Sequence, residues 1–170
     1  RHYRRNVKKV RELLLALGIN WADIEFDAVE HHIAHASSSY HLSGFEGKTA
    51  ILGIDGKGEY ATTFFGYGEN GHIHKIKEFY DPDSLGQVYA SFTEYLGFEM
   101  LDGEYKVMGM APYGNPDLYD LSRLVHFDGK EITVNTELVN TIGLRRYKEG
   151  RKGYYFSQKL IDWLGPRRQG

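Results

Sequence analysis

Three of the eight histidines lie within five residues, in the run from His31 to Tyr40. Residues i and i+4 of an α-helix are roughly 40° apart around the axis and about 6 Å apart along it. His31 and His35 can therefore direct both imidazoles at one ion, whereas His32 points away from that line. Histidine also caps helices and packs against aromatic rings. The spacing favours a structural role and a metal or phosphoryl site about equally, and a metal site would need further ligands.

A glycine-rich turn, Asp-Gly-Lys-Gly-Glu, follows an apolar stretch and runs from Asp55 to Glu59. Its glycines expose backbone N–H groups and leave room for a phosphate to approach the main chain. An acidic residue at the strand end can hold the accompanying metal ion. Asp-Gly is also the commonest hairpin turn, so a plain turn is the more frequent explanation. The predicted phosphate-binding residues are Asp55, Gly56, Lys57, Gly58 and Glu59.

Lys106 lies among apolar residues and glycines in the stretch GEYKVMG. A lysine in such surroundings either places its ammonium on an anion or extends it along apolar surface to water. Both roles stay open from the sequence alone.

The N-terminal third predicts two helices and a strand. Apolar residues recur at spacings of three and four from Tyr3 to Leu17 and stop at Gly18, which predicts a helix with one buried face. Residues 26–30 are expected to form a short strand that leads to the histidines. The small residues from Ile33 to Leu42 predict a closely packed helix.

The rest of the chain changes period. Three β-rich runs between residues 48 and 79, separated by the turns DGKG and GENG, predict a three-stranded meander. Helices are expected over residues 84–98, 118–124 and 154–164, with a hairpin turning at residues 128–129. This pattern predicts a mixed α/β domain in which a β-meander is flanked by helices.

Composition is that of an ordinary globular domain, with 170 residues, 41% hydrophobic and 26% charged. The absence of cysteine excludes disulfides, thiolate zinc sites and a cysteine nucleophile within this sequence. A net charge of −2 gives no general attraction to nucleic acid or to anionic membranes, and no run approaches the ~18 apolar residues of a membrane span. We therefore expect a cytoplasmic protein with neither nucleic acid nor membrane as partner.

Four motifs in register resemble one family. HHIAHASSSY, ILGIDGKGEYATT, SLGQVYASFTEYLGF and GEYKVMGMAPYG occur in this order and at the separations typical of O-carbamoyltransferases of the nodulation-protein and antibiotic-modifying type. The resemblance is dense over residues 31–116 and looser on both sides. Four motifs together are far more specific than any one of them.

The resemblance implies an actin-like ATPase (ribonuclease H-like) fold, akin to that of the universal tRNA threonylcarbamoyl transferase. In such enzymes an HxxxH pair and a distant aspartate hold a metal. Here the pair is His31 and His35, and Asp55 is the best aspartate within the chain to join them. A further aspartate motif would lie beyond residue 170.

The implied domain organisation is a fragment. Residues 1–170 would belong to the actin-like domain, with residues 1–47 ending a first subdomain that carries the histidine helix. Residues 48–170 would form the meander and helices of a second subdomain. A YrdC-like domain of the same parent chain is expected outside this sequence, and the isolated fragment is expected to be inactive.

The implied reaction is transfer of a carbamoyl group from carbamoyl phosphate, through a carbamoyl adenylate made with ATP and Mg²⁺, to the hydroxyl of a small molecule. The expected resident metal is a divalent ion, Fe²⁺ above others. The predicted catalytic residues are His32 and Lys106. His32 would accept a proton or support the metal ligands, and Lys106 would contact an anionic group. The alternatives are a threonylcarbamoyl transferase-like enzyme, disfavoured because no basic stripe is present, and a non-catalytic nucleotide-binding module.

Overall fold

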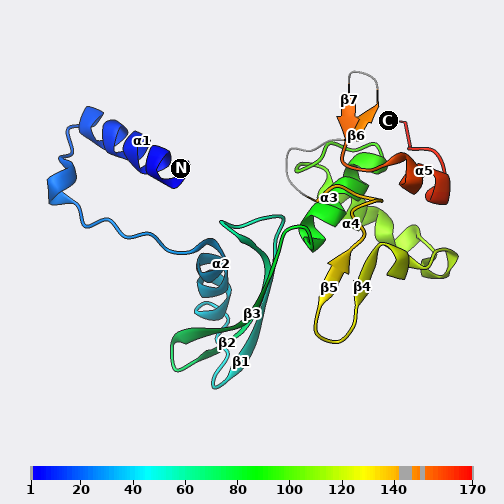
Figure 1. Cartoon of the computed structure of the whole chain (residues 1–170). Coiled ribbons are helices and arrows are strands. Elements are labelled where there is room, and N and C mark those ends of the chain that lie inside the picture. Colours follow the sequence, from blue (N-terminus) through cyan, green and yellow to red (C-terminus); the bar gives the residue numbers. More distant parts are fainter. Residues whose placement is uncertain (1, 142–146, 150–151, 170) are drawn as a thin grey trace.

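The computed structural model describes residues 2–141, 147–149 and 152–169 and shows a mixed α/β chain with small antiparallel sheets (Figure 1). The α-helices are α1 (His2–Ala16), α2 (His31–Tyr40), α3 (Leu85–Tyr95), α4 (Glu104–Met110) and α5 (Gln158–Leu164). The strands are β1 (Thr49–Ile54), β2 (Ala61–Glu69), β3 (His72–Tyr80), β4 (Val125–Phe127), β5 (Ile132–Val134), β6 (Tyr147–Glu149) and β7 (Lys152–Tyr154). Short 3₁₀ turns are η1 (Trp21–Asp23), η2 (Ala111–Tyr113), η3 (Pro116–Leu118) and η4 (Leu121–Arg123).

The predicted three-stranded meander is confirmed. Strands β1, β2 and β3 pair antiparallel in sequence order. Asn70 and Gly71 join β2 to β3 with φ values of 51° and 76°. Two successive positive φ angles are what a two-residue hairpin with right-handed strand twist requires, and Asn-Gly adopts them at least cost. Local turn chemistry therefore determines this part of the fold.

Helix α2 packs on one face of the meander, and together they form what we call the sheet lobe. Ala36, Ile51 and Phe64 make its buried core, with Tyr40 and Ile73 packed against them. At Gly68 a Cβ would lie 2.4 Å from the Tyr40 ring, so only glycine permits this approach. This core contains residues from both sides of the predicted subdomain boundary between residues 47 and 48. The boundary itself stays a prediction.

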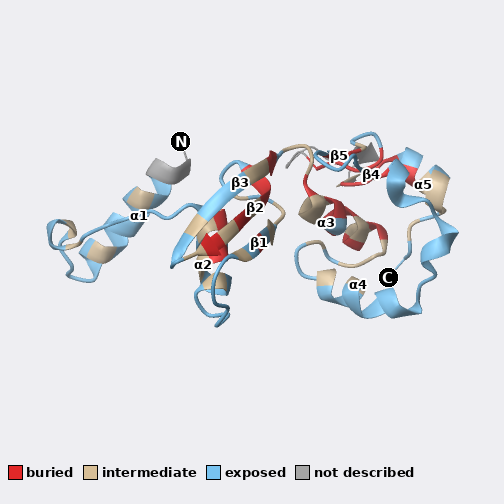
Figure 2. Ribbon diagram, turned by 90° about the horizontal axis from the view of Figure 1, so that it is seen from below, coloured by how far each residue is buried: buried red, intermediate tan, exposed pale blue. Residues whose placement is uncertain are grey.

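A second cluster, which we call the C-terminal lobe, is built from α3, α4, β4, β5 and α5. Its buried residues are Val88, Tyr95, Leu124, Val134, Leu138, Val139, Phe156 and Leu160. Figure 2 shows buried residues in β2 of the sheet lobe and in α3 of the C-terminal lobe. The predicted hairpin at residues 128–129 is confirmed, because β4 pairs with β5 across a turn in which Gly129 has a φ of 94°.

Helix α1 forms as predicted, but the prediction of a buried face is wrong. Leu13 and Leu17 are 62% and 67% exposed. Figure 1 shows α1 joined to α2 by a long extended segment and lying apart from both lobes. An amphipathic helix buries its apolar stripe only where another surface meets it, and among the closer element pairs of the described ranges α1 is found only with the short turn η1.

Three further expectations are corrected. Residues 26–30 form no strand, because no described segment pairs with them. Residues 118–124 form short 3₁₀ turns in place of an α-helix, since Asn115 and Asp120 accept hydrogen bonds from N–H groups two residues on and so compete with helical bonding. The last helix begins at Gln158, after Ser157 caps it, and not at residue 154.

The helices of the described ranges are all too short or too polar to cross a membrane.

Candidate metal centre

The first two turns of α2 hold the histidine pair. The helix begins at His31, two residues before the predicted start, so both histidines lie within regular helix. The Nε2 atoms of His31 and His35 are 3.1 Å apart. The i, i+4 spacing thus produces the convergence expected from helical geometry.

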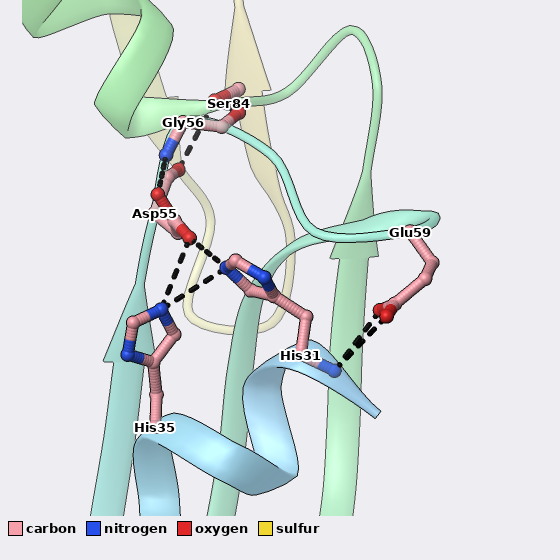
Figure 3. Close-up of polar contacts among 6 residues, drawn as sticks. All are labelled: His31, His35, Asp55, Gly56, Glu59 and Ser84. Atoms are coloured by element: carbon pink, nitrogen blue, oxygen red, sulfur yellow. Dashed lines mark hydrogen bonds and ion pairs between the residues drawn. The ribbon is translucent and has the colours of Figure 1, made fainter. Parts of the chain in front are cut away.

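Asp55 completes a cluster of three side chains (Figure 3). It follows the last residue of β1, and its Oδ2 contacts His31 Nε2 and lies 3.6 Å from His35 Nε2. The three donor atoms all lie within 4.8 Å of one another. The structure therefore brings together the three predicted ligands, which are separated by up to 24 residues in sequence; the bound ion stays a prediction.

The donor set suits a first-row transition metal. Two imidazole nitrogens and one carboxylate oxygen are the protein ligands typical of non-haem iron(II) and of catalytic zinc sites. Donors about 2.1 Å from one ion, at the angles of octahedral or tetrahedral coordination, lie roughly 3.0–3.4 Å apart. The separations of His35 Nε2 from His31 Nε2 and from Asp55 Oδ2, 3.1 and 3.6 Å, are close to that range.

The surroundings of Asp55 favour the charged form of its carboxylate. Partial burial alone would raise the pKa of Asp55. Hydrogen bonds from His31 and from the Gly56 N–H, together with the charges of both histidines, outweigh this effect, and the net shift of the pKa is downward. Its Oδ1 accepts the Gly56 N–H at 2.6 Å, which leaves Oδ2 directed at the imidazoles. The carboxylate is thus ionised and oriented, as a metal ligand must be.

Glu59 lies at the start of α2, and its predicted part in phosphate binding stays a prediction. Its carboxylate accepts the His31 N–H at 3.1 and 3.2 Å, from 28 residues away in sequence. Hydrogen bonds from its own N–H and from His31 lower the pKa of Glu59. A negative charge at a helix N-terminus is favourable. Glu30, at the N-cap position, makes no capping bond and pairs with Lys75 at 2.9 Å.

The loop between β1 and β2 spans six residues, and its N–H groups at both glycines have partners inside the chain. Gly56 N–H bonds to Asp55 Oδ1 and Gly58 N–H bonds to Ala61 O at 2.8 Å. The ammonium of Lys57 pairs with Asp81. Phosphate binding by this loop stays a prediction, and it would have to replace these contacts.

Both glycines of this loop lie close to neighbouring side chains. A Cβ at Gly58 would lie 3.0 Å from the His32 ring, and a Cβ at Gly56 would lie 3.1 Å from Gln87 Nε2. Neither glycine has a positive φ. A side chain at either position would therefore need the His32 ring or the end of the Gln87 side chain to shift by a few tenths of an ångström, with no backbone strain added.

His32 is buried beneath the loop. It is 2% exposed, its ring meets the His31 ring edge-on at 5.4 Å, and its Nε2 has no hydrogen-bond partner within the described residues. It lines a cavity of about 280 Å³ beside Asp55 and a second of about 250 Å³ beside Glu59. Its predicted role as proton acceptor or as support for the metal ligands stays a prediction.

Lys106 is not brought to the metal ligands. It lies on α4, in the C-terminal lobe, with its ammonium 5.7 Å from the centre of the Phe98 ring and 5.6 Å from that of Tyr105. The ammonium thus lies over two aromatic rings of the C-terminal lobe and does not contact the three predicted metal ligands. Its catalytic role stays a prediction.

Ser84 is a residue of the site that the sequence did not single out. It caps α3, and its hydroxyl also donates to Gly56 O at 2.8 Å (Figure 3). The pattern Ser-Leu-Gly-Gln, with Gln87 three residues after Ser84, is a capping-box signature that predicts the helix start. No sequence signal predicts the bond to Gly56, because it crosses 28 residues.

Comparison with known proteins gives the family. The nodulation protein NolNO of Sinorhizobium fredii is 38% identical over 139 residues, which cover 79% of this chain and 20% of the relative. The nodulation protein NolO of Bradyrhizobium diazoefficiens is 36% identical over 137 residues, 79% of this chain and 25% of the relative. The uncharacterized protein sll1178 of Synechocystis sp. is 46% identical over 92 residues, 54% of this chain and 15% of the relative.

The chain thus spans a quarter or less of the length of these relatives. The model of a family described as carbamoyltransferase N-terminus matches residues 1–156, which include α2, the meander and all three predicted metal ligands. All four motifs lie within the residues that the family model matches, and this chain belongs to the carbamoyltransferase N-terminus family.

Proposed function

We propose that this chain is the metal-binding part of an ATP-dependent O-carbamoyltransferase with an actin-like, ribonuclease H-like fold. The observation that carries the proposal is the convergence of His31, His35 and Asp55, within 4.8 Å, in a chain of the carbamoyltransferase N-terminus family. The matches to two relatives named as nodulation proteins agree with the resemblance of the four motifs to O-carbamoyltransferases of the nodulation-protein type.

The proposed reaction uses carbamoyl phosphate, ATP with Mg²⁺ and a small-molecule hydroxyl. Carbamoyl phosphate would lose its phosphate to water, and the resulting carbamate would attack the α-phosphorus of ATP, which gives carbamoyl adenylate and releases pyrophosphate. The acceptor hydroxyl would then attack the carbamoyl carbon, so that AMP leaves and the hydroxyl proton passes to a base. A YrdC-like domain of the same protein would carry the activation. The proposed setting is the cytoplasm.

Within this scheme the residues of the chain hold and orient an ion. His31 and His35 offer imidazole nitrogens from one helix, and Asp55 offers a carboxylate from the end of β1. A divalent ion bound there, for which we propose Fe²⁺, would supply positive charge to neutralise phosphate oxygens. Glu59 secures the start of α2 and so keeps the first imidazole in place.

Metal content tests the ligand assignment. His31→Ala, His35→Ala and Asp55→Asn in the full-length protein should each lower the affinity for Fe²⁺ by more than the ~10- to 100-fold typical of residues that only support a ligand. His41→Ala is the matched control, because His41 lies at the far end of the same helix and its ring meets Tyr40. Full metal content in the three ligand variants contradicts the proposed centre.

Pyrophosphate release tests the reaction without knowledge of the acceptor. The metal-loaded full-length protein should release pyrophosphate from ATP when carbamoyl phosphate is present, and the His35→Ala variant should not. Metal binding without this release in the wild type would favour a non-catalytic nucleotide-binding module.

A further inference from the structure

The hydroxyl of Ser84 joins the start of α3 to the loop that carries Asp55. Ser84 is fully buried, and its Oγ accepts the Gln87 N–H at 3.1 Å as the helix cap. A serine hydroxyl has a single proton to donate, and the shorter of its two carbonyl contacts is Gly56 O at 2.8 Å. One buried side chain therefore serves the helix and the loop at the same time.

Gly56 is held from both sides. Its N–H bonds to Asp55 Oδ1 at 2.6 Å, and its C=O accepts the proton of Ser84. With Oδ1 engaged in this way, the carboxylate plane is restricted and Oδ2 remains for the two histidines, as Figure 3 shows. A chain of hydrogen bonds thus runs from Ser84 through Gly56 to Asp55.

The first turn of α3 also presses on the same backbone. A Cβ at Gly86 would lie 2.5 Å from the Asp55 carbonyl carbon and oxygen and from the Gly56 nitrogen. Backbone atoms at that distance cannot move aside as a flexible side chain can. Just before α3, Asp81 pairs with Lys57 and gives the loop a second polar anchor.

We infer that Ser84 is a positioning residue of the metal centre, which orients Asp55 through Gly56 and so couples metal affinity to the start of α3. The inference rests on the proposed metal site. It goes beyond that site in assigning a residue of the next lobe, 29 positions after Asp55, a part in metal binding that its role as a helix cap does not require.

The competing explanation is that Ser84 only caps α3. Loss of an N-cap lowers stability wherever the helix lies, so stability alone does not separate the two roles. Ser157 provides the matched control, because it is also buried, also caps a helix, and accepts the Leu160 N–H at 3.3 Å. It lies in the C-terminal lobe and contacts neither Asp55 nor Gly56.

The test compares Ser84→Ala with Ser157→Ala in the full-length protein, by Co²⁺ titration followed in the visible spectrum and by thermal melting. Both variants should melt at lower temperature. Only Ser84→Ala should weaken Co²⁺ binding, by about 10- to 100-fold per folded molecule, and shift the absorption bands that report ligand geometry. Ser84→Gly keeps most of the capping preference but has no hydroxyl, and it should weaken Co²⁺ binding in the same way. It replaces Ser84→Ala in the test if that variant does not fold.

Wild-type Co²⁺ affinity and spectrum in the Ser84 variants, with loss of binding in His35→Ala, would overturn this inference and leave the metal centre intact. Equal weakening by Ser157→Ala would overturn it as well, because the effect would then be general destabilisation. Unchanged binding in His35→Ala would instead overturn the metal centre and the inference together.

Discussion

The two lobes are stabilised in different ways. Among the described residues the C-terminal lobe has eight buried residues in one apolar cluster, and the sheet lobe has three. The C-terminal cluster is rich in ring contacts, such as those of Phe156 with Tyr95 at 5.4 Å and with Tyr154 at 4.9 Å. The sheet lobe relies more on Phe64 and on buried polar residues, His32, Thr62 and Thr63.

The candidate metal centre lies on the lobe with the smaller core. Its geometry depends on polar links between distant segments, which are Glu59 to the start of α2 and Ser84 to the loop after β1. The C-terminal lobe supplies one of these links, since Ser84 begins α3. A site on the lobe with the smaller core would thus take part of its rigidity from the neighbouring lobe, as a preorganised site requires.

Phe64→Ala should give the largest loss, about 3–5 kcal/mol of unfolding free energy. The ring is fully buried, covers Gly53 and Gly66 in the sheet, and lies 6.3 Å from the His32 ring. Metal affinity per folded molecule should fall as well, because the helix loses the surface on which it rests. Chemical denaturation and Co²⁺ titration measure both quantities. Retained affinity would mean that the polar links alone hold the site.

Leu160→Ala tests the other lobe. Leu160 is fully buried in the larger cluster, and a buried leucine truncated to alanine costs about 2–5 kcal/mol. Because Leu160 has no contact with the loop after β1, Co²⁺ affinity per folded molecule should stay at the wild-type value. A fall in affinity as large as that of Phe64→Ala would contradict the distinction between the lobes.

Gly86→Ala tests the contact between them. A methyl group there has no space, so we expect a destabilisation of about 1–3 kcal/mol together with weaker Co²⁺ binding. Gly109→Ala is the control, because no atom lies within 4 Å of a Cβ at Gly109. That helical substitution should be neutral or stabilise by up to about 1 kcal/mol. Similar effects of the two variants on metal binding would show that the close contact at Gly86 does not support the metal centre.

Glu59→Gln should give the smallest effect, about 0.3–1 kcal/mol, since it keeps an acceptor for His31 N–H and loses only the charge. The pKa of Glu59 is lowered by folding from its ordinary 4.5. Its charge therefore stabilises the native state above about pH 4.5, and this contribution is lost as pH falls through the lowered pKa. Melting temperatures of wild type and variant, followed from about pH 7 to about pH 3, should converge in acid. A constant difference would show that the charge is not involved.

Much of the local structure follows from the sequence. The meander, the Asn-Gly turn and the cap of α3 are determined by alternation, turn chemistry and capping, all of which act between residues a few positions apart. The same holds for the convergence of His31 and His35, which the helical period produces. Local predictions also failed in places, for example at residues 118–124, where side-chain bonds to nearby N–H groups prevailed over helix formation.

The tertiary structure alone decided which of these local pieces meet. Asp55 reaches the histidines, and Glu59 reaches the helix start, across 24 and 28 residues because α2 packs on the meander. The exposed apolar stripe of α1 shows the converse, since its pattern is clear and no described surface covers most of it. Sequence periodicity sets which face of an element is apolar or reactive. The packing of elements, which depends on shape and on long-range burial, sets what that face will contact.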